Sequence, residues 1–186
     1  DVFDNKYTLL PLPGAFVDPN MPAGYAPFGI QNINGTLYVT YALQDDDAED
    51  DVAGPGHGFV DAYDTAGNLL RRVASRGPLN SPWGLALAPA GFGAFSNMLL
   101  IGNFGDGRIN AYDLSVSTST GDAVAVGPLH SAKGPPLKID GLWALQFGNG
   151  AGAGPKTTLF FTSGPFDEAH GLFGSLVPAG PPGHNK

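Results

Sequence analysis

The sequence predicts an all-β fold of short strands, from its composition and from an internal repeat. Glycine (28) and proline (17) are abundant among the 186 residues, and only 14% are charged, which is typical of short strands joined by tight turns. The apolar residues form short runs punctuated by Gly, Asn and Pro. Similar runs recur along the chain: Ile30 and Leu85, at matching places, lie 55 residues apart. Helical repeats do not produce this pattern.

Each repeat contains the same series of strands. The first strand starts near an aromatic residue, the second is a plain apolar run and the third follows a glycine. We expect first strands at 27–30, 82–87 and 141–145, second strands at 36–41, 98–103 and 158–162, and third strands at 58–64, 107–113 and 171–176. Two repeats add a fourth strand, at 68–73 and 122–126. Asn34-Gly35 predicts a two-residue hairpin turn with positive φ. Four short strands at this period are typical of a β-propeller blade.

Several motifs in these strands resemble those of a known superfamily. Pro82-Trp83-Gly84-Leu85-Ala86, Asn103-Phe104-Gly105-Asp106-Gly107-Arg108-Ile109-Asn110-Ala111 and Val60-Asp61-Ala62-Tyr63-Asp64 resemble the NHL-type six-bladed β-propellers. Residues 17–35, from Val17-Asp18-Pro19-Asn20 to Asn34-Gly35, are similar to a family of uncharacterised, exported bacterial propeller proteins. The resemblance implies a closed ring, export and an extracellular or cell-surface role. It implies no reaction.

The repeat divides the chain into parts of a ring. We expect blades at about 26–80, 81–138 and 139–177, the end of a preceding blade at 1–25, and a Pro/Gly-rich tail at 178–186. Members of the similar family are about twice as long, so the chain corresponds to their C-terminal half. Closed propellers have about four to eight blades, and open blade edges invite pairing. The expected partners are therefore the N-terminal half of the same propeller, a second copy of the chain, or a neighbour in an assembly.

Charge and cysteine content exclude several classes of function. The net charge is −8 with only nine Lys and Arg, which argues against nucleic-acid binding. No apolar run reaches the roughly 18 residues that a membrane-spanning helix needs. The absence of cysteine excludes disulfides, thiol catalysis and Cys-ligated zinc.

Metal-ligand side chains recur at one place in the repeat. The residue before the third-strand glycine is His57, Asp106 or His170, and the loops that carry them should open on one rim of the ring. Imidazoles and carboxylates at equivalent positions could hold a metal ion. A polar residue before a turn glycine is also ordinary turn chemistry.

A dense acidic run lies in the first of these loops. It contains six acids in seven positions, namely Asp45, Asp46, Asp47, Glu49, Asp50 and Asp51. Such a run repels itself unless solvent or a cation screens it, and Ca²⁺ or another divalent cation takes oxygen ligands of this kind. A solvated loop, a weak cation site and a partner-docking loop all remain open.

Two kinds of function remain. No nucleophile elbow, His-Glu-x-x-His helix or phosphate loop is present, which favours a non-catalytic recognition, scaffold or assembly module. The alternative is a metal-dependent hydrolase similar to the lactonase and gluconolactonase propellers, with Asn32, Asn103 and Asn149 to compare with their channel ligands.

The aromatic residues Phe28, Trp83 and Trp143 could pack between blades or stack on a ligand. Arg71-Arg72 is expected to protect an outer strand from edge pairing.

Overall fold

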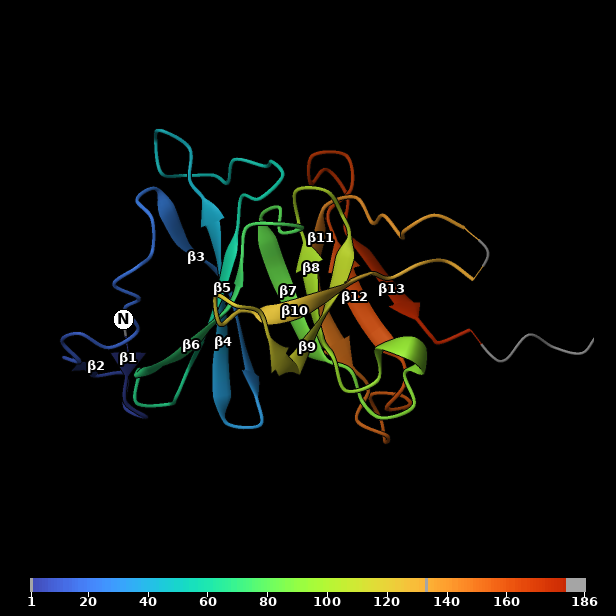
Figure 1. Cartoon of the computed structure of the whole chain (residues 1–186), viewed down its shortest axis with the longest axis horizontal. Coiled ribbons are helices and arrows are strands. Elements are labelled where there is room, and N and C mark those ends of the chain that lie inside the picture. The colour runs from blue at the N-terminus through green and yellow to red at the C-terminus, as the bar shows by residue number, and fades with distance from the viewer. Residues whose placement is uncertain (1, 133, 180–186) are drawn as a thin grey trace, which may run out of the picture.

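The computed structural model describes residues 2–132 and 134–179 and shows an all-β chain (Figure 1). Three successive antiparallel meanders account for most of it. The first sheet has the order β3-β4-β5-β6, the second has β7-β8-β9-β10, and the third has β11-β12-β13. In each sheet the strands lie side by side in the order in which they occur along the chain, as the repeat predicted.

The first sheet contains the strands β3 (Tyr25–Ile33), β4 (Thr36–Leu43), β5 (Phe59–Tyr63) and β6 (Leu69–Ser75). Its first turn confirms the hairpin prediction, because Asn34 and Gly35 have φ of 53° and 85°. Positive φ at both central residues matches the right-handed twist of the flanking strands, and Gly and Asn adopt it readily.

The second sheet contains the strands β7 (Pro82–Leu87), β8 (Leu99–Asn103), β9 (Ile109–Ser117) and β10 (Ala123–Pro128). A short 3-10 helix, η1 (Gly93–Phe95), interrupts the connection between β7 and β8. The third sheet has only β11 (Leu142–Phe147), β12 (Leu159–Ser163) and β13 (Leu172–Leu176). All eleven strands expected from the repeat are therefore present.

A small hairpin precedes the first sheet. It pairs β1 (Val2–Phe3) with β2 (Leu9–Leu10). Its turn has the same construction as the turns between third and fourth strands: the Asp4 Oδ1 atom accepts the backbone N–H groups of Lys6 and Thr8, as Asp64 Oδ1 accepts those of Ala66 and Asn68. Asp113 Oδ1 accepts from Ser115 at the corresponding place in the second sheet.

Asp4 and Asp64 in their turns and Asp113 inside β9 share an electrostatic property. Hydrogen bonds to each carboxylate lower the pKa of Asp4, Asp64 and Asp113. The turn between β1 and β2 thus resembles the turn between the third and fourth strands of the first sheet, and the assignment of residues 1–25 to the end of a preceding blade stays a prediction.

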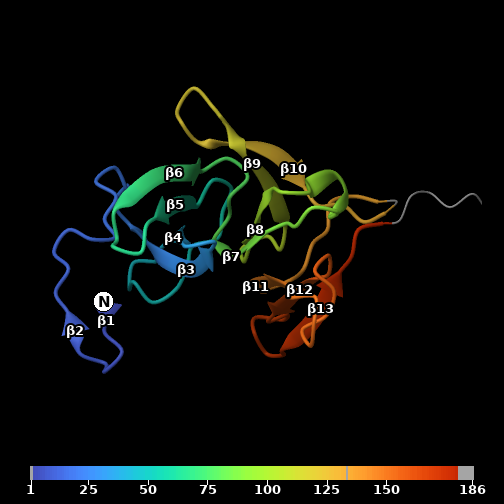
Figure 2. The same cartoon turned by 90° about the horizontal axis from the view of Figure 1, so that it is seen from below.

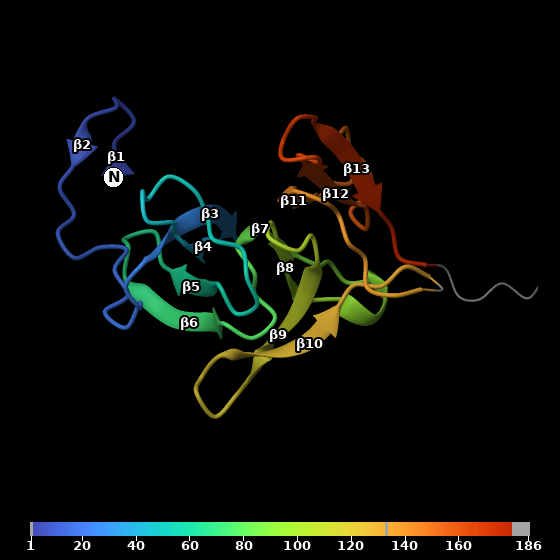
Figure 3. The ribbon, with the colours of Figure 1, turned by 90° about the horizontal axis from the view of Figure 1, so that it is seen from above.

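The three sheets fan outward from their first strands (Figures 2 and 3). The first strands β3, β7 and β11 lie next to one another, and the last strands β6, β10 and β13 lie on the outside. Two apolar clusters fill the spaces between the sheets. One joins the first sheet to the second, with Val60, Leu85 and Ile101 among its buried members, and the other joins the second to the third, with Ile109 and Leu145.

Glycine allows the first strands to approach closely. A Cβ atom on Gly29 would lie 2.5 Å from the carbonyl oxygen of Trp83, and one on Gly84 would lie 2.5 Å from that of Trp143. These glycines occupy equivalent places in the repeat, and neither position leaves room for a methyl group. The same inter-strand contact is therefore made twice.

Candidate functional site

The loops that connect second to third strands gather at one edge of the molecule (Figure 1). They follow β4, β8 and β12 and comprise residues 44–58, 104–108 and 164–171. All three lie at the top of Figure 1, as the repeat predicted, and we call this edge the upper rim. The candidate metal-ligating residues are all in these loops.

The acidic run forms a tight turn that extends β4. Gln44 bridges to Asp51, the backbone N–H of Asp45 donates to the carbonyl of Asp50 at 2.9 Å, and Ala48 has a φ of 57°. The carboxylates of Asp46, Asp47, Glu49 and Asp50 are exposed. Backbone hydrogen bonds thus hold the loop closed while most of the acids face solvent.

The three equivalent rim residues are each held by their own loop. The His57 Nδ1 atom lies 2.8 Å from the carbonyl oxygen of Val52. Asp106 Oδ1 accepts from Asn103 Nδ2 at 3.0 Å. The His170 ring meets Phe166 edge to face, with 5.9 Å between ring centroids. Across the described residues, no three His, Asp or Glu side chains lie close enough together to hold a metal ion. Neither the three rim residues His57, Asp106 and His170 nor the acidic run therefore brings metal-ligand atoms together around one point.

Two of the asparagines compared with hydrolase ligands serve local turns, and the third is buried at the end of β8. Asn32 Oδ1 accepts the backbone N–H of Gly35 at 3.0 Å in the first hairpin. Asn103 is buried and donates to the carbonyl of Pro78 at 2.9 Å. Asn149 Oδ1 accepts the backbone N–H of Ala151 at 2.8 Å. The structure does not bring these three side chains together around one point.

Aromatic side chains cluster near the upper ends of the first two sheets. The Phe28 and Trp83 ring centroids lie 4.7 Å apart, and Phe104 closes a triangle at 6.1 and 6.0 Å from them. All three rings are half-buried. Trp143 differs, because its ring packs on Gly164 and its Nε1 donates to Glu168 Oε1 at 2.9 Å. These rings pack between sheets and still present some surface.

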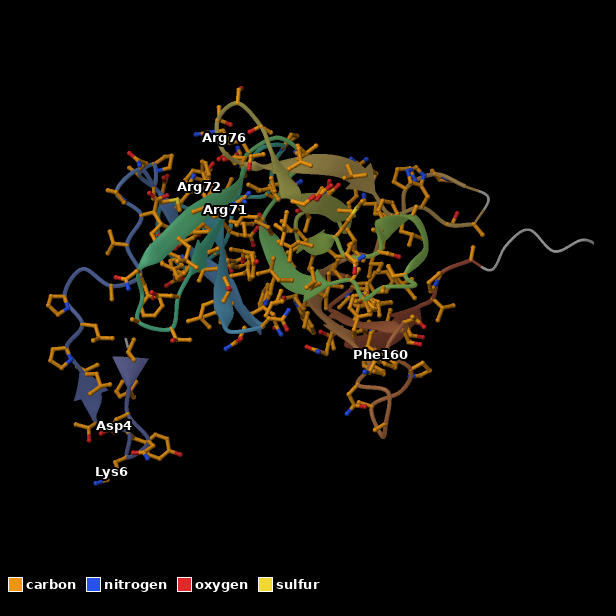
Figure 4. All side chains as sticks on the ribbon, turned by 60° about the horizontal axis from the view of Figure 1, so that its bottom comes forward. Asp4, Lys6, Arg71, Arg72, Arg76 and Phe160 are labelled. Carbon is orange, nitrogen blue, oxygen red and sulfur yellow. The ribbon has the colours of Figure 1, made fainter. Side chains whose placement is uncertain are left out.

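The structure contains a buried charge network that was not predicted from the sequence. Arg72, which was expected only to guard an outer strand, forms ion pairs with Asp61 of β5 and with Asp18 of the segment before β3. Figure 4 shows Arg72 between Arg71 and Arg76 on the first sheet. Both carboxylate side chains are almost fully buried. Arg72 thus ties the N-terminal segment to the sheet.

Burial of Asp61 opposes its ionisation, whereas the guanidinium of Arg72 favours it. Burial raises the pKa of the Asp61 carboxyl to about 7, against the opposing effect of the hydrogen bond that the Tyr63 hydroxyl donates. Tyr63 also shares a 2.8 Å hydroxyl contact with Tyr41. The alternation along β5 was an available signal, because Asp61 lies on the same face as the buried rings of Phe59 and Tyr63.

Comparisons identify relatives but no reaction. The chain is 37% identical over 184 residues to an uncharacterized protein of Acanthamoeba polyphaga mimivirus, covering 94% of this chain and 42% of that protein. It is 35% identical over 189 residues to a second uncharacterized protein of the same virus, covering 95% of this chain and 46% of that protein. The chain spans less than half the length of these relatives. No family model and no solved structure matches it.

The described residues form no helix with the length and hydropathy that crossing a membrane requires.

We expect the acidic turn to bind Ca²⁺ only weakly or not at all, because its carboxylates are spread over an exposed turn instead of converging. Calorimetric titration with Ca²⁺, with proteolysis in parallel, measures this. No heat and no protection at millimolar Ca²⁺ is the expected result. Saturable heat that disappears when the six acids are changed to Asn and Gln would show that the turn closes around a cation.

Proposed function

We propose that the three sheets are successive blades of an NHL-like β-propeller and that the protein is a non-catalytic recognition, scaffold or assembly module. The observation that carries this proposal is the repeated packing of like sheets. Each sheet is an antiparallel meander, adjacent first strands meet at an equivalent glycine, and the second-to-third loops share the upper rim. Rigid sheets with variable loops at one edge suit recognition.

The resemblance to exported propellers supports an extracellular place for this module. The expected partners cover the two open ends of the array: the N-terminal half of the same propeller, a second copy, or an assembly neighbour. Relatives of more than twice this length are compatible with the first of these. Contacts with ligands would use the acidic and aromatic side chains of the upper rim.

The alternative, a metal-dependent hydrolase, has less support from the geometry. Such an enzyme needs carboxylate, imidazole or amide oxygen and nitrogen atoms that converge on an ion with an open coordination position. Asn32 and Asn149 are instead occupied in separate turns. Asn103 has a buried Oδ1 atom without a hydrogen-bond partner, but within the described residues no group of three His, Asp or Glu side chains converges on it.

Hydrolysis assays distinguish the two functions. The chain is incubated with lactones and aryl esters, with Ca²⁺, Mn²⁺ or Zn²⁺ in turn, and product formation is compared with buffer containing the same metal. A module without catalytic function gives no rate above buffer. A saturable rate that EDTA abolishes, and that Asn32→Ala, Asn103→Ala and Asn149→Ala each reduce, would overturn the proposal in favour of the hydrolase.

A further inference from the structure

The first hairpin turn carries a sequence pattern that the proposed function does not use. Asn34-Gly35-Thr36 has the form of an N-linked glycosylation acceptor, in which asparagine is followed by any residue except proline and then by serine or threonine. The chain contains eleven asparagines, and Asn34 is the only one that fits this pattern.

The structure places this pattern at an exposed tip. Asn34 and Gly35 are the central residues of the turn between β3 and β4, and both are exposed. A Cβ atom added to Gly35 would meet no described atom within 4 Å apart from its chain neighbours, so open space surrounds the turn. A glycan is bulky and solubilising, and it needs a surface position of this kind.

The side chain that holds the turn is that of Asn32 and not that of Asn34. Asn32 Oδ1 accepts the backbone N–H of Gly35 at 3.0 Å. The positive φ at Asn34 and Gly35 supplies the rest of the turn geometry, because it matches the twist of the two strands. A substituent on the Asn34 amide therefore leaves the hydrogen bond that holds the turn intact.

The turn lies at the edge of the molecule opposite the upper rim (Figure 1). The strands β3 and β4 join at their lower ends, whereas the loops that follow β4, β8 and β12 lie at the top. A glycan on Asn34 would therefore leave the second-to-third loops uncovered. It would also stand at the tip of the hairpin and not on a face of the first sheet, so the packing between sheets would not change.

A small recess beside Asn34 suits the first sugar of a glycan. Its volume is about 230 Å³, and it lies among the lower ends of the first strands, with Asn34, Leu87 and Phe147 in its lining. Gln31 and Gln146 line it as well, and their Nε2 and Oε1 atoms lie 3.4 Å apart. A sugar ring has apolar faces and polar hydroxyl groups, and this lining offers apolar surface beside amide groups.

The order of folding leaves the acceptor accessible for a time. A two-stranded hairpin is only marginally stable alone, and the second neighbour of β4 is β5, which begins 23 residues after Thr36. Synthesis at about 5–20 residues per second makes this interval about one to five seconds. A transferase can therefore reach Asn34 before the first sheet forms.

We propose that Asn34 is an N-linked glycosylation site. The donor is a lipid-linked oligosaccharide diphosphate, and an oligosaccharyltransferase catalyses the step. The bond between the sugar C1 atom and the diphosphate oxygen breaks, a bond between C1 and Asn34 Nδ2 forms, the amide loses one proton and the lipid diphosphate leaves. The inference rests on the proposed extracellular place of the module, because the chain meets this donor on a secretory route.

Secretion of the full chain from a eukaryotic cell, behind a cleavable signal peptide, tests the site by intact mass. The wild-type chain should carry added mass that peptide N-glycosidase removes, and the enzyme should convert Asn34 to aspartate. Asn34→Gln and Thr36→Ala should each abolish the added mass. Thr36→Ser should retain it, because serine also satisfies the acceptor pattern.

Asn149 provides the matched control. It also precedes a glycine in a turn, but Ala151 stands where the pattern requires serine or threonine, so Asn149→Gln should leave the added mass unchanged. Because transfer precedes folding, the mass is read in the cell extract as well as in the medium, and a chain that is not released still decides the question.

Two results would overturn the proposal: a wild-type chain without sugar on Asn34, or a sugar that persists in Thr36→Ala. Neither result depends on the hydrolysis assays. The failure of this proposal is therefore distinguishable from the failure of the proposed function.

Discussion

Arg72→Leu should destabilise the chain by roughly 3 to 5 kcal/mol, because it leaves the buried Asp61 carboxylate without a counter-charge. The same change frees Asp18 and removes the guanidinium group from the face of the Phe59 ring, 4.6 Å from its centroid. Urea unfolding at pH 8 measures the difference in free energy. Arg108→Leu is the control, since its pair with Asp106 is exposed, and it should change stability by less than about 1 kcal/mol.

The loss in free energy of unfolding caused by Arg72→Leu should decrease as the pH falls. Burial raises the pKa of Asp61 from 3.8 to about 7, so the folded chain binds more protons than the unfolded chain between these values. Loss of the guanidinium raises the pKa of Asp61 further. The stability difference between wild type and variant should therefore be largest well above pH 7 and shrink as the pH falls below 7, where Asp61 is protonated in both folded chains. A deficit that is constant from pH 8 to pH 5 would indicate lost packing and not an uncompensated charge.

Trp83→Ala should lower the free energy of unfolding by roughly 3 kcal/mol, the second largest effect expected. This is near the lower end for a large aromatic residue changed to alanine, because the ring is half-buried. The ring contacts Phe28 and Phe104 and lies against the backbone at Gly29, so its loss opens a cavity between the first two sheets. Thermal unfolding measures this.

A second aromatic residue provides the comparison for Trp83. Phe166 is 72% exposed on the upper rim, and Phe166→Ala should leave stability within about 0.5 kcal/mol of the wild type. If Trp83→Ala left the melting temperature unchanged and instead abolished binding of a ligand, the ring would be a stacking platform and not a packing element.

The strands could be predicted because local chemistry and the repeat agreed. Each run of alternating or continuous apolar residues ended at a residue with a strong turn preference, such as Gly35 after β3 or Gly107 before β9. A positive φ at both positions is what glycine provides at low cost. Comparison of the repeats then identified which runs are equivalent, including the short strand β13.

The charge network could not be predicted in the same way. Asp18 lies 54 residues from Arg72 in the sequence, and their contact depends on how the segment before β3 folds over the first sheet. A pair of arginines on an outer strand is compatible with a solvent-exposed edge, so composition alone favoured the wrong environment. The alternation along β5 indicates a buried Asp61, but its pairing with Arg72 follows from the register of β5 against β6, which places the two residues opposite each other.

For the candidate metal-ligating residues, the edge of the molecule could be predicted and the side-chain contacts could not. The repeat correctly placed His57, Asp106 and His170 in loops on one edge. It could not reveal that neighbouring groups in each loop engage these side chains: the Val52 carbonyl for His57, Asn103 for Asp106 and Phe166 for His170. Equivalence in a repeat fixes which edge a residue occupies, whereas ligation requires side chains to converge within a few ångströms.

Substitution of the glycines at which first strands meet tests the central claim, that like sheets pack in one repeated way, most directly. Gly29→Ala and Gly84→Ala each place a methyl group where a Cβ atom would lie 2.5 Å from a carbonyl oxygen of the next first strand, so both should lower the free energy of unfolding by about 1 to 3 kcal/mol. Gly152→Ala, where no atom lies within 4 Å of the added Cβ, is the control and should leave it within about 0.5 kcal/mol of the wild type. Urea unfolding of the three variants measures this, and a Gly29→Ala or Gly84→Ala variant as stable as Gly152→Ala would contradict repeated close packing of the first strands.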